Sequence, residues 1–253
     1  MLIDLRLFGK PRFLWGTVAF VIVGFAMMGV MFVISPFLQS VQGADAQGTG
    51  IRLLPLIGGI LAGALVSDRL VSRFGSKLVV ATGLVVMAGS LFALSRVGAG
   101  TGYSFVAVTL AISGVGLGFG MPAAIDSVLG SLPSEATGAG TGISRALQNL
   151  ATTLGPSILG SVLTSTYRAD LSAHLQSLPA GVRSVAEGSV SGAVVVARRL
   201  PPGPGLPLLR AAASAYTQAM SEVLLICGGV GLAGAVLVLL FLPARAPNAA
   251  GWR

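Results

Sequence analysis

Three charged side chains lie inside stretches of sequence that are otherwise apolar: Asp126, Arg145 and Glu222. A charge in hydrocarbon costs about 3 kcal/mol or more, so each one requires a partner, an aqueous cavity or a place near an interface. Arg145 lies about nine residues inside its apolar stretch, which corresponds to about 14 Å of helix. We therefore expect the Arg145 side chain to face protein or water.

Polar side chains accompany Arg145 along one helix face. Thr141, Arg145, Gln148 and Thr152 follow one another at helical spacing, and Asn149 lies beside them. The spacing predicts a single polar stripe on an apolar helix. The stripe either lines a cavity that admits a solute or packs against polar groups of another helix.

Asp126 has two interpretations. It either approaches Arg145 as an ion pair or proton site, or it is an interfacial carboxylate near the end of its helix. In the first case proton binding would depend on the distance between the two groups and would couple to movement of the helices. Glu222 and His174 fall near the opposite surface, where such residues are ordinary surface groups.

The elements that must position these residues are membrane helices. The chain has 253 residues, of which 54% are hydrophobic and 9% charged, and its mean hydropathy is +0.88. A bilayer needs about 20 apolar residues per helical span and leaves no backbone group unpaired, which favours an all-α integral membrane fold. Six spans and an outer loop at 165–214 are expected in one membrane domain covering 1–253, the spans at 13–38, 53–67, 78–94, 103–129, 136–164 and 215–242.

Within the outer loop, the stretch 180–197 predicts a short interfacial helix. The proline-rich run 201–207 that follows is expected to form a turn and no helix. Small residues predict close helix packing at Gly59, Gly63 and Ser67 in the second span, and at Gly116, Gly120 and Ala124 in the fourth.

The distribution of basic residues predicts the orientation in the bilayer. One side of the expected arrangement carries most of them: Arg6, Lys10, Arg12, Arg69, Arg73, Lys77, Arg245 and Arg253. The other side carries Arg52 and Arg96, with further arginines in the outer loop. Because cytoplasmic loops are enriched in lysine and arginine, both termini are expected on the cytoplasmic side of the cell membrane.

Several functional classes are disfavoured by composition. The net charge is +8, but the basic residues are dispersed and aromatic residues make up only 6%, which argues against nucleic-acid binding. A single cysteine, Cys227, and a single histidine leave no disulfide, no metal site and no catalytic pairing within the chain, and no cofactor is indicated. The glycine-rich run 229–234 lies inside an apolar span and predicts helix packing, not a dinucleotide site.

The loop after the second span resembles the cytoplasmic loop motif of the major facilitator superfamily. The matching residues are Asp68, Arg69, Arg73, Gly75 and Lys77, although Ser72 stands where that family carries an acid. In the family this loop is associated with a charge network that latches the inward-facing end, and Asp68 could replace the missing acid. The alternative is a plain basic turn.

Most of the chain is similar to the carboxy-terminal half of fourteen-span drug/proton antiporters of the QacA/EmrB type. The similarity is carried by stretches such as 118–133, 159–163 and 239–245. It implies proton-coupled efflux of drugs or other small amphipathic molecules by alternating access. Ser144 and Arg145 stand where related proteins often carry an amide and a carboxylate, which makes an anionic substrate more plausible.

A second family pattern falls in the fifth span. Gly142, Gly155, Pro156 and Gly160 have the spacing of the antiporter motif. A Gly-Pro pair removes a helical hydrogen bond and allows a kink, which either serves transport or is structural.

Such a transporter needs two six-span halves around a midplane site. The expected partners are therefore the lipid bilayer, a small-molecule substrate and a second half, which is either a separate chain or a copy of this one. A truncated product or a non-transporting six-span membrane assembly protein is the alternative.

Overall fold

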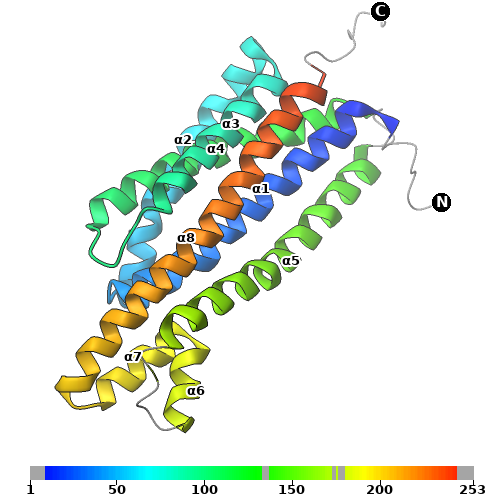
Figure 1. Ribbon diagram of the computed structural model, residues 1–253. Coiled ribbons are helices and arrows are strands. Elements are labelled where there is room, and N and C mark those ends of the chain that lie inside the picture. The colour runs from blue at the N-terminus through cyan, green and yellow to red at the C-terminus, as the bar shows by residue number, and fades with distance from the viewer. Residues whose placement is uncertain (1–8, 133–136, 173–174, 176–179, 244–253) are drawn as a thin grey trace, which may run out of the picture.

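The computed structural model describes residues 9–132, 137–172, 175 and 180–243. All regular structure in these residues is helical, and the long helices form one elongated bundle (Figure 1). The elements are α1 Pro11–Pro36, a π-helical turn η2 Phe37–Val41, α2 Ala46–Phe74, α3 Ser76–Leu94, α4 Tyr103–Leu129, α5 Thr137–Ser172, α6 Ala180–Gly188, α7 Val190–Arg199 and α8 Pro202–Phe241. The expectations for His174, Arg6, Arg245 and Arg253 lie outside the described residues.

Five helices within the described residues are long and apolar enough to cross a membrane. They are Pro11–Val41, Ala46–Phe74, Ser76–Leu94, Tyr103–Leu129 and Gly203–Phe241. The prediction of six such spans is therefore confirmed for five, and the fifth in order, α5, is not among them. That helix is long, but Arg145, Gln148 and Asn149 lie in its first half, and serine, threonine and glycine are frequent in the rest of it.

Helix extends further into the expected outer loop than the sequence suggested. The stretch 180–197 is helical as predicted, but it forms two helices, and the Ser189 side chain between them caps α7 by accepting the Gly192 N–H. The prediction of a non-helical turn at 201–207 is wrong, because α8 begins at Pro202. Pro202 and Pro204 lie in the first turn of α8, where a missing N–H has no helical partner, whereas Pro207 lies inside the helix.

The packing of α2 on α4 depends on small residues, as predicted. A Cβ atom on Gly63 would lie 2.6 Å from the Val115 carbonyl oxygen and 3.0 Å from the Gly118 Cα. One turn further on, the Ser67 hydroxyl donates to the Phe119 carbonyl at 3.4 Å. The two backbones are therefore in direct contact, which only very small side chains permit.

A second glycine contact joins α3 to α4. A Cβ atom on Gly83 would lie 2.7 Å from the Gly120 nitrogen and 2.8 Å from the Gly116 oxygen. The predicted small face of α4 therefore packs on α3, whereas Gly114 and Gly118 serve the contact with α2. Helix α4 thus carries two glycine faces and holds its neighbours closely on both.

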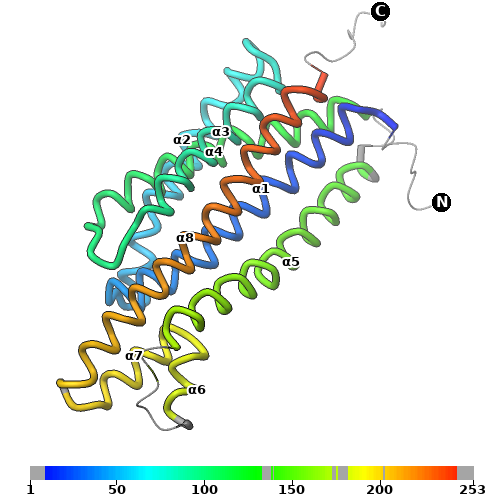
Figure 2. Tube along the Cα trace, in the orientation of Figure 1, coloured from blue at the N-terminus to red at the C-terminus, as the bar shows by residue number. Residues whose placement is uncertain are grey.

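Helix α1 runs between α8 and α5 (Figure 2). At one end the Trp15 ring stacks on Phe241 of α8, with ring centroids 4.7 Å apart. Toward α5, the Phe25 ring lies 3.2 Å from a Cβ position on Gly155, and Phe32 lies 3.3 Å from one on Gly160. The glycines of α5 therefore accept large aromatic side chains of α1.

Different elements meet at the two ends of the bundle. The start of α1, the end of α8 and the end of α4 lie together, since Trp15 stacks on Phe241 and the Arg12 guanidinium lies beside Gly130. At the opposite end η2 contacts α7 through a hydrogen bond of 2.9 Å between the Ser40 and Ser191 hydroxyls.

Candidate functional site

The predicted polar stripe lies on α5 as a continuous row, but its members differ in burial. Gln148 is 6% exposed, Thr141 and Thr152 are half-buried, and Arg145 and Asn149 are exposed in this chain. The Thr152 hydroxyl donates to the Asn149 carbonyl of its own helix at 3.0 Å. The stripe therefore has an inner edge against α1 and an outer edge that the described residues leave exposed.

The inner edge is a polar seam between α1 and α5. The Thr17 and Ser144 hydroxyls form a buried hydrogen bond of 2.9 Å. Gln148 packs on Gly24 so closely that a Cβ there would lie 2.9 Å from the Gln148 Cγ. Polar helix packing, one of the two predicted roles, is therefore present on this edge.

Arg145 occupies the outer edge. Its guanidinium carbon lies 5.6 Å from the centroid of the Phe20 ring, within range of a cation–π contact. A small pocket of about 30 Å³ adjoins it, lined by residues of α1, α4 and α5: Phe20, Ile125, Val128, Leu129, Thr141, Ser144 and Arg145. The pocket has room for about one water molecule, and beside Arg145 only Thr141 and Ser144 bring polar side chains to its lining. Arg145 therefore borders a mostly apolar pocket, and its place in a transport cavity stays a prediction.

Asp126 does not join this site. It is exposed near the end of α4, and the charged groups that act on it are Asp68 of α2 and Arg12 of α1. Among the described residues no ion pair links Asp126 to Arg145, so the predicted pairing is not found. The residues of α4 that line the Arg145 pocket are Ile125, Val128 and Leu129, and Asp126 is not among them. The interfacial interpretation fits this position.

The loop motif forms the tight connection between α2 and α3. Gly75 ends one helix and begins the next with φ of +82°, a conformation that favours glycine. Asp68, Arg69 and Arg73 are exposed, and the Arg73 guanidinium lies 5.5 Å from the ring centroid of Phe74. Gly75 therefore allows the tight turn between the two helices, and these three charged side chains of the motif face outward.

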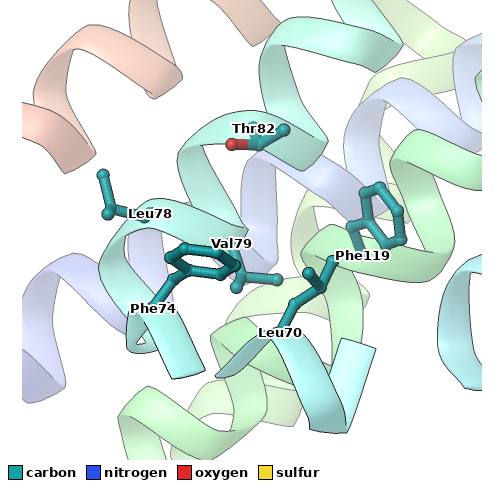
Figure 3. Close-up of a pocket in the computed structure, with 6 residues that line it drawn as sticks. All are labelled: Leu70, Phe74, Leu78, Val79, Thr82 and Phe119. Atoms are coloured by element: carbon teal, nitrogen blue, oxygen red, sulfur yellow. The ribbon is translucent and has the colours of Figure 1, made fainter. Parts of the chain in front are cut away.

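A cavity of about 280 Å³ adjoins this loop (Figure 3). It is lined by Leu70, Phe74, Leu78, Val79, Thr82 and Phe119. Thr82 contributes the only side-chain heteroatom among these residues, so the cavity offers apolar contact and no chemistry. It is not a reaction centre.

The antiporter-like residues of α5 have separate surroundings. Gly155 and Gly160 contact aromatic rings of α1, and Pro156 lies within the continuous helix. Gly142 has no atom within 4 Å of its Cβ position. The structure therefore gives Gly155 and Gly160 a packing role.

Sequence reasoning missed two contributors to the site, Thr17 and Phe20 of α1. Both sit in an apolar run of a strongly hydrophobic helix, and no local pattern distinguishes them. Their relevance follows only from the packing of α1 on α5. Among the described residues, no three His, Cys, Asp or Glu side chains gather as a metal site would require.

Comparison with known families decides the class of protein. The family model described as Major Facilitator Superfamily matches residues 2–156, more than half of the chain. The chain belongs to the major facilitator superfamily. It is therefore a membrane protein of a transporter family, and the arrangement above is part of a major facilitator fold.

Relatives in this superfamily are named for export and resistance. The tetracenomycin C resistance and export protein of Streptomyces glaucescens is 28% identical over 94% of this chain and 45% of that protein. The multidrug efflux pump LfrA of Mycolicibacterium smegmatis is 25% identical over 94% of this chain and 47% of that protein. The methyl viologen resistance protein SmvA of Salmonella typhimurium is 27% identical with the same coverage. The chain thus spans about half the length of these relatives.

The fold has a solved counterpart. A bacterial homologue of the human lysosomal transporter Spinster, in an inward-facing and unoccupied conformation, superposes with a TM-score of 0.65 at 17% identity. The match covers 96% of this chain and 51% of that transporter. At this identity the likeness concerns the fold alone, and it extends over about half of that transporter.

Proposed function

We propose that this chain is the carboxy-terminal, six-span half of a fourteen-span exporter of the QacA/EmrB type. Together with a second half it would move drugs or other small amphipathic molecules out of the cell by alternating access. The observation that carries the proposal is its alignment along 94% of its length with export and resistance proteins of which it covers 45–47%. Residues 1–253 form a single membrane domain in this proposal.

Helix α5 would be the sixth span, with its polar face covered by the second half. Beyond the stripe, its exposed side chains include Thr153, Ser157 and Ser161 at intervals of four residues. A row of small polar residues suits contact with another helix or with water better than contact with lipid. A separately encoded half is our first choice for the partner, ahead of a second copy of this chain.

In this proposal both termini face the cytoplasm. The described end that holds the start of α1 and the end of α4 carries Lys10 and Arg12, and α2 contributes Arg69 and Arg73. Positive residues favour the cytoplasmic side. The loop from Ser67 to Lys77 would then latch the cytoplasmic end between transport states.

Arg145 would provide the electrostatic attraction of the substrate cavity. Its charge favours solutes with anionic or carbonyl groups, and its contact with Phe20 allows an aromatic solute to stack nearby. Asp126 would be the proton acceptor, because it is exposed near the end of α4, where charges on α1 and α2 act on it, and its protonation would respond to any change in those surroundings during transport.

The test uses the full chain in a drug-sensitive bacterial host, with efflux of a cationic dye and of an anionic dye followed by fluorescence. Arg145→Leu is compared with Arg145→Lys, and with Arg96→Leu, which removes an exposed charge at a helix connection. We expect Arg145→Leu to lower anionic-dye efflux by about tenfold or more, which corresponds to about 1.4 kcal/mol. Arg145→Lys should retain part of the activity.

Equal efflux by the Arg145→Leu and Arg96→Leu proteins at matched membrane levels would remove Arg145 from the transport site. No efflux above the empty-vector control, even with an amino-terminal half of a relative supplied, would favour the non-transporting alternative.

A further inference from the structure

Arg12, in the first turn of α1, is half-buried. Two of its three guanidinium nitrogens, Nε and Nη1, are shielded from solvent and have no hydrogen-bond partner among the described residues. Its Nη2 lies 3.5 Å from the Cβ position of Gly130 at the end of α4. Buried donors, charged ones above all, are strongly destabilising unless an acceptor satisfies them.

Nearby groups in the described part of the chain do not supply that acceptor. Asp126 acts on Arg12 through space, but the two form no ion pair in the described part of the chain. The neighbouring Lys10 donates its Nζ hydrogen to the Ser131 carbonyl at 3.3 Å. Two cationic side chains are therefore close together, and no carboxylate is hydrogen-bonded to either of them among the described residues.

These side chains line a cavity. Its volume is about 400 Å³, and it lies between the ends of three helices, lined by Lys10, Arg12, Gly130, Ser131 and Pro243 among others. A water molecule occupies about 30 Å³ in the liquid, so the cavity has room for a group much larger than water. It therefore combines two cationic side chains with space for a polyatomic anion.

The position of the cavity indicates which anion it holds. It lies at the end of the membrane helices, where lipid headgroups lie, and basic pockets between transmembrane helices bind anionic headgroups. The guanidinium fork matches the geometry of two phosphate oxygens, and a lysine adds a point charge. We propose that this cavity binds the phosphate of an anionic phospholipid through Arg12 and Lys10. This inference goes beyond the proposed export function and does not depend on it.

The test measures lipid retention by the purified full chain. The protein is delipidated in detergent and titrated with phosphatidylglycerol, and bound lipid is counted by native mass spectrometry, with phosphatidylcholine as the neutral reference. We expect Arg12→Gln to weaken phosphatidylglycerol binding by about tenfold or more and Lys10→Gln by about fivefold. Arg69→Gln is the matched control, since it removes an exposed positive charge that does not line the cavity.

Lys10→Gln keeps the proposal testable if Arg12→Gln folds poorly, because the Lys10 side chain is exposed and contributes little packing. Equal loss of lipid in all three variants, or no loss in Lys10→Gln, would overturn the proposal. So would inorganic phosphate displacing phosphatidylglycerol at equal concentration, since the site would then recognise a soluble anion. The lipid-binding result does not depend on whether the protein exports dye.

Discussion

Replacement of Gly63 by alanine should separate α2 from α4. The added methyl group would lie 2.6 Å from the Val115 carbonyl oxygen, whereas ordinary contacts begin at 3.4 Å. The difference requires the two backbones to move apart by about 0.8 Å. Forcing an extra carbon into a packed interface costs about 1–3 kcal/mol, and this contact joins two backbones that have no flexible side chain to rotate away.

The matched control is Gly58→Ala on the same helix, where no atom lies within 4 Å of the added methyl. Both changes raise helix propensity equally, by up to about 1 kcal/mol, so the difference between them isolates the steric cost. Unfolding in mixed detergent micelles, followed by tryptophan fluorescence, should show Gly63→Ala less stable than Gly58→Ala by about 1–3 kcal/mol. Equal stability of the two variants would refute direct backbone contact between α2 and α4.

Two further outcomes follow from local geometry. Gly75→Ala should destabilise the protein by about 1 kcal/mol, because φ of +82° is unfavourable for alanine; unchanged unfolding would contradict that backbone conformation. A double-mutant cycle with Thr17→Val and Ser144→Ala should give a coupling of about 0.6 kcal/mol, measured by the same unfolding assay, and additive effects would mean that the two hydroxyls do not interact.

The spans and their close contacts could be predicted because they depend on local composition. Apolar runs of the required length located five of the spanning helices, and small residues at intervals of four located the α2 face at Gly59, Gly63 and Ser67. The helix that packs on each glycine face was harder to predict. Helix α4 carries glycines on two adjoining faces, and sequence alone does not say which partner meets Gly116 and which meets Gly118.

The candidate site could be predicted only in part. Periodicity placed Arg145 and Gln148 on one face of α5, but the division between buried and exposed members depends on where α1 packs. Whether Asp126 pairs with Arg145 depends on how α4 is rotated about its own axis, which the sequence does not specify. In the structure the preceding residue, Ile125, lines the pocket beside Arg145. The start of α8 at Pro202 was missed because proline was weighed as a helix breaker without regard to its place in the first turn.

Contact between α1 and α8 brings the two ends of the described chain together. These are the first and last helices of the described chain, yet Trp15 stacks on Phe241, and Gly9 and Pro243 line the same cavity. Two helices far apart in the sequence are therefore neighbours in space, and the described chain begins and ends at the same end of the bundle. A circularly permuted chain would bury the same glycine contacts, because the fold is specified by which helix faces meet.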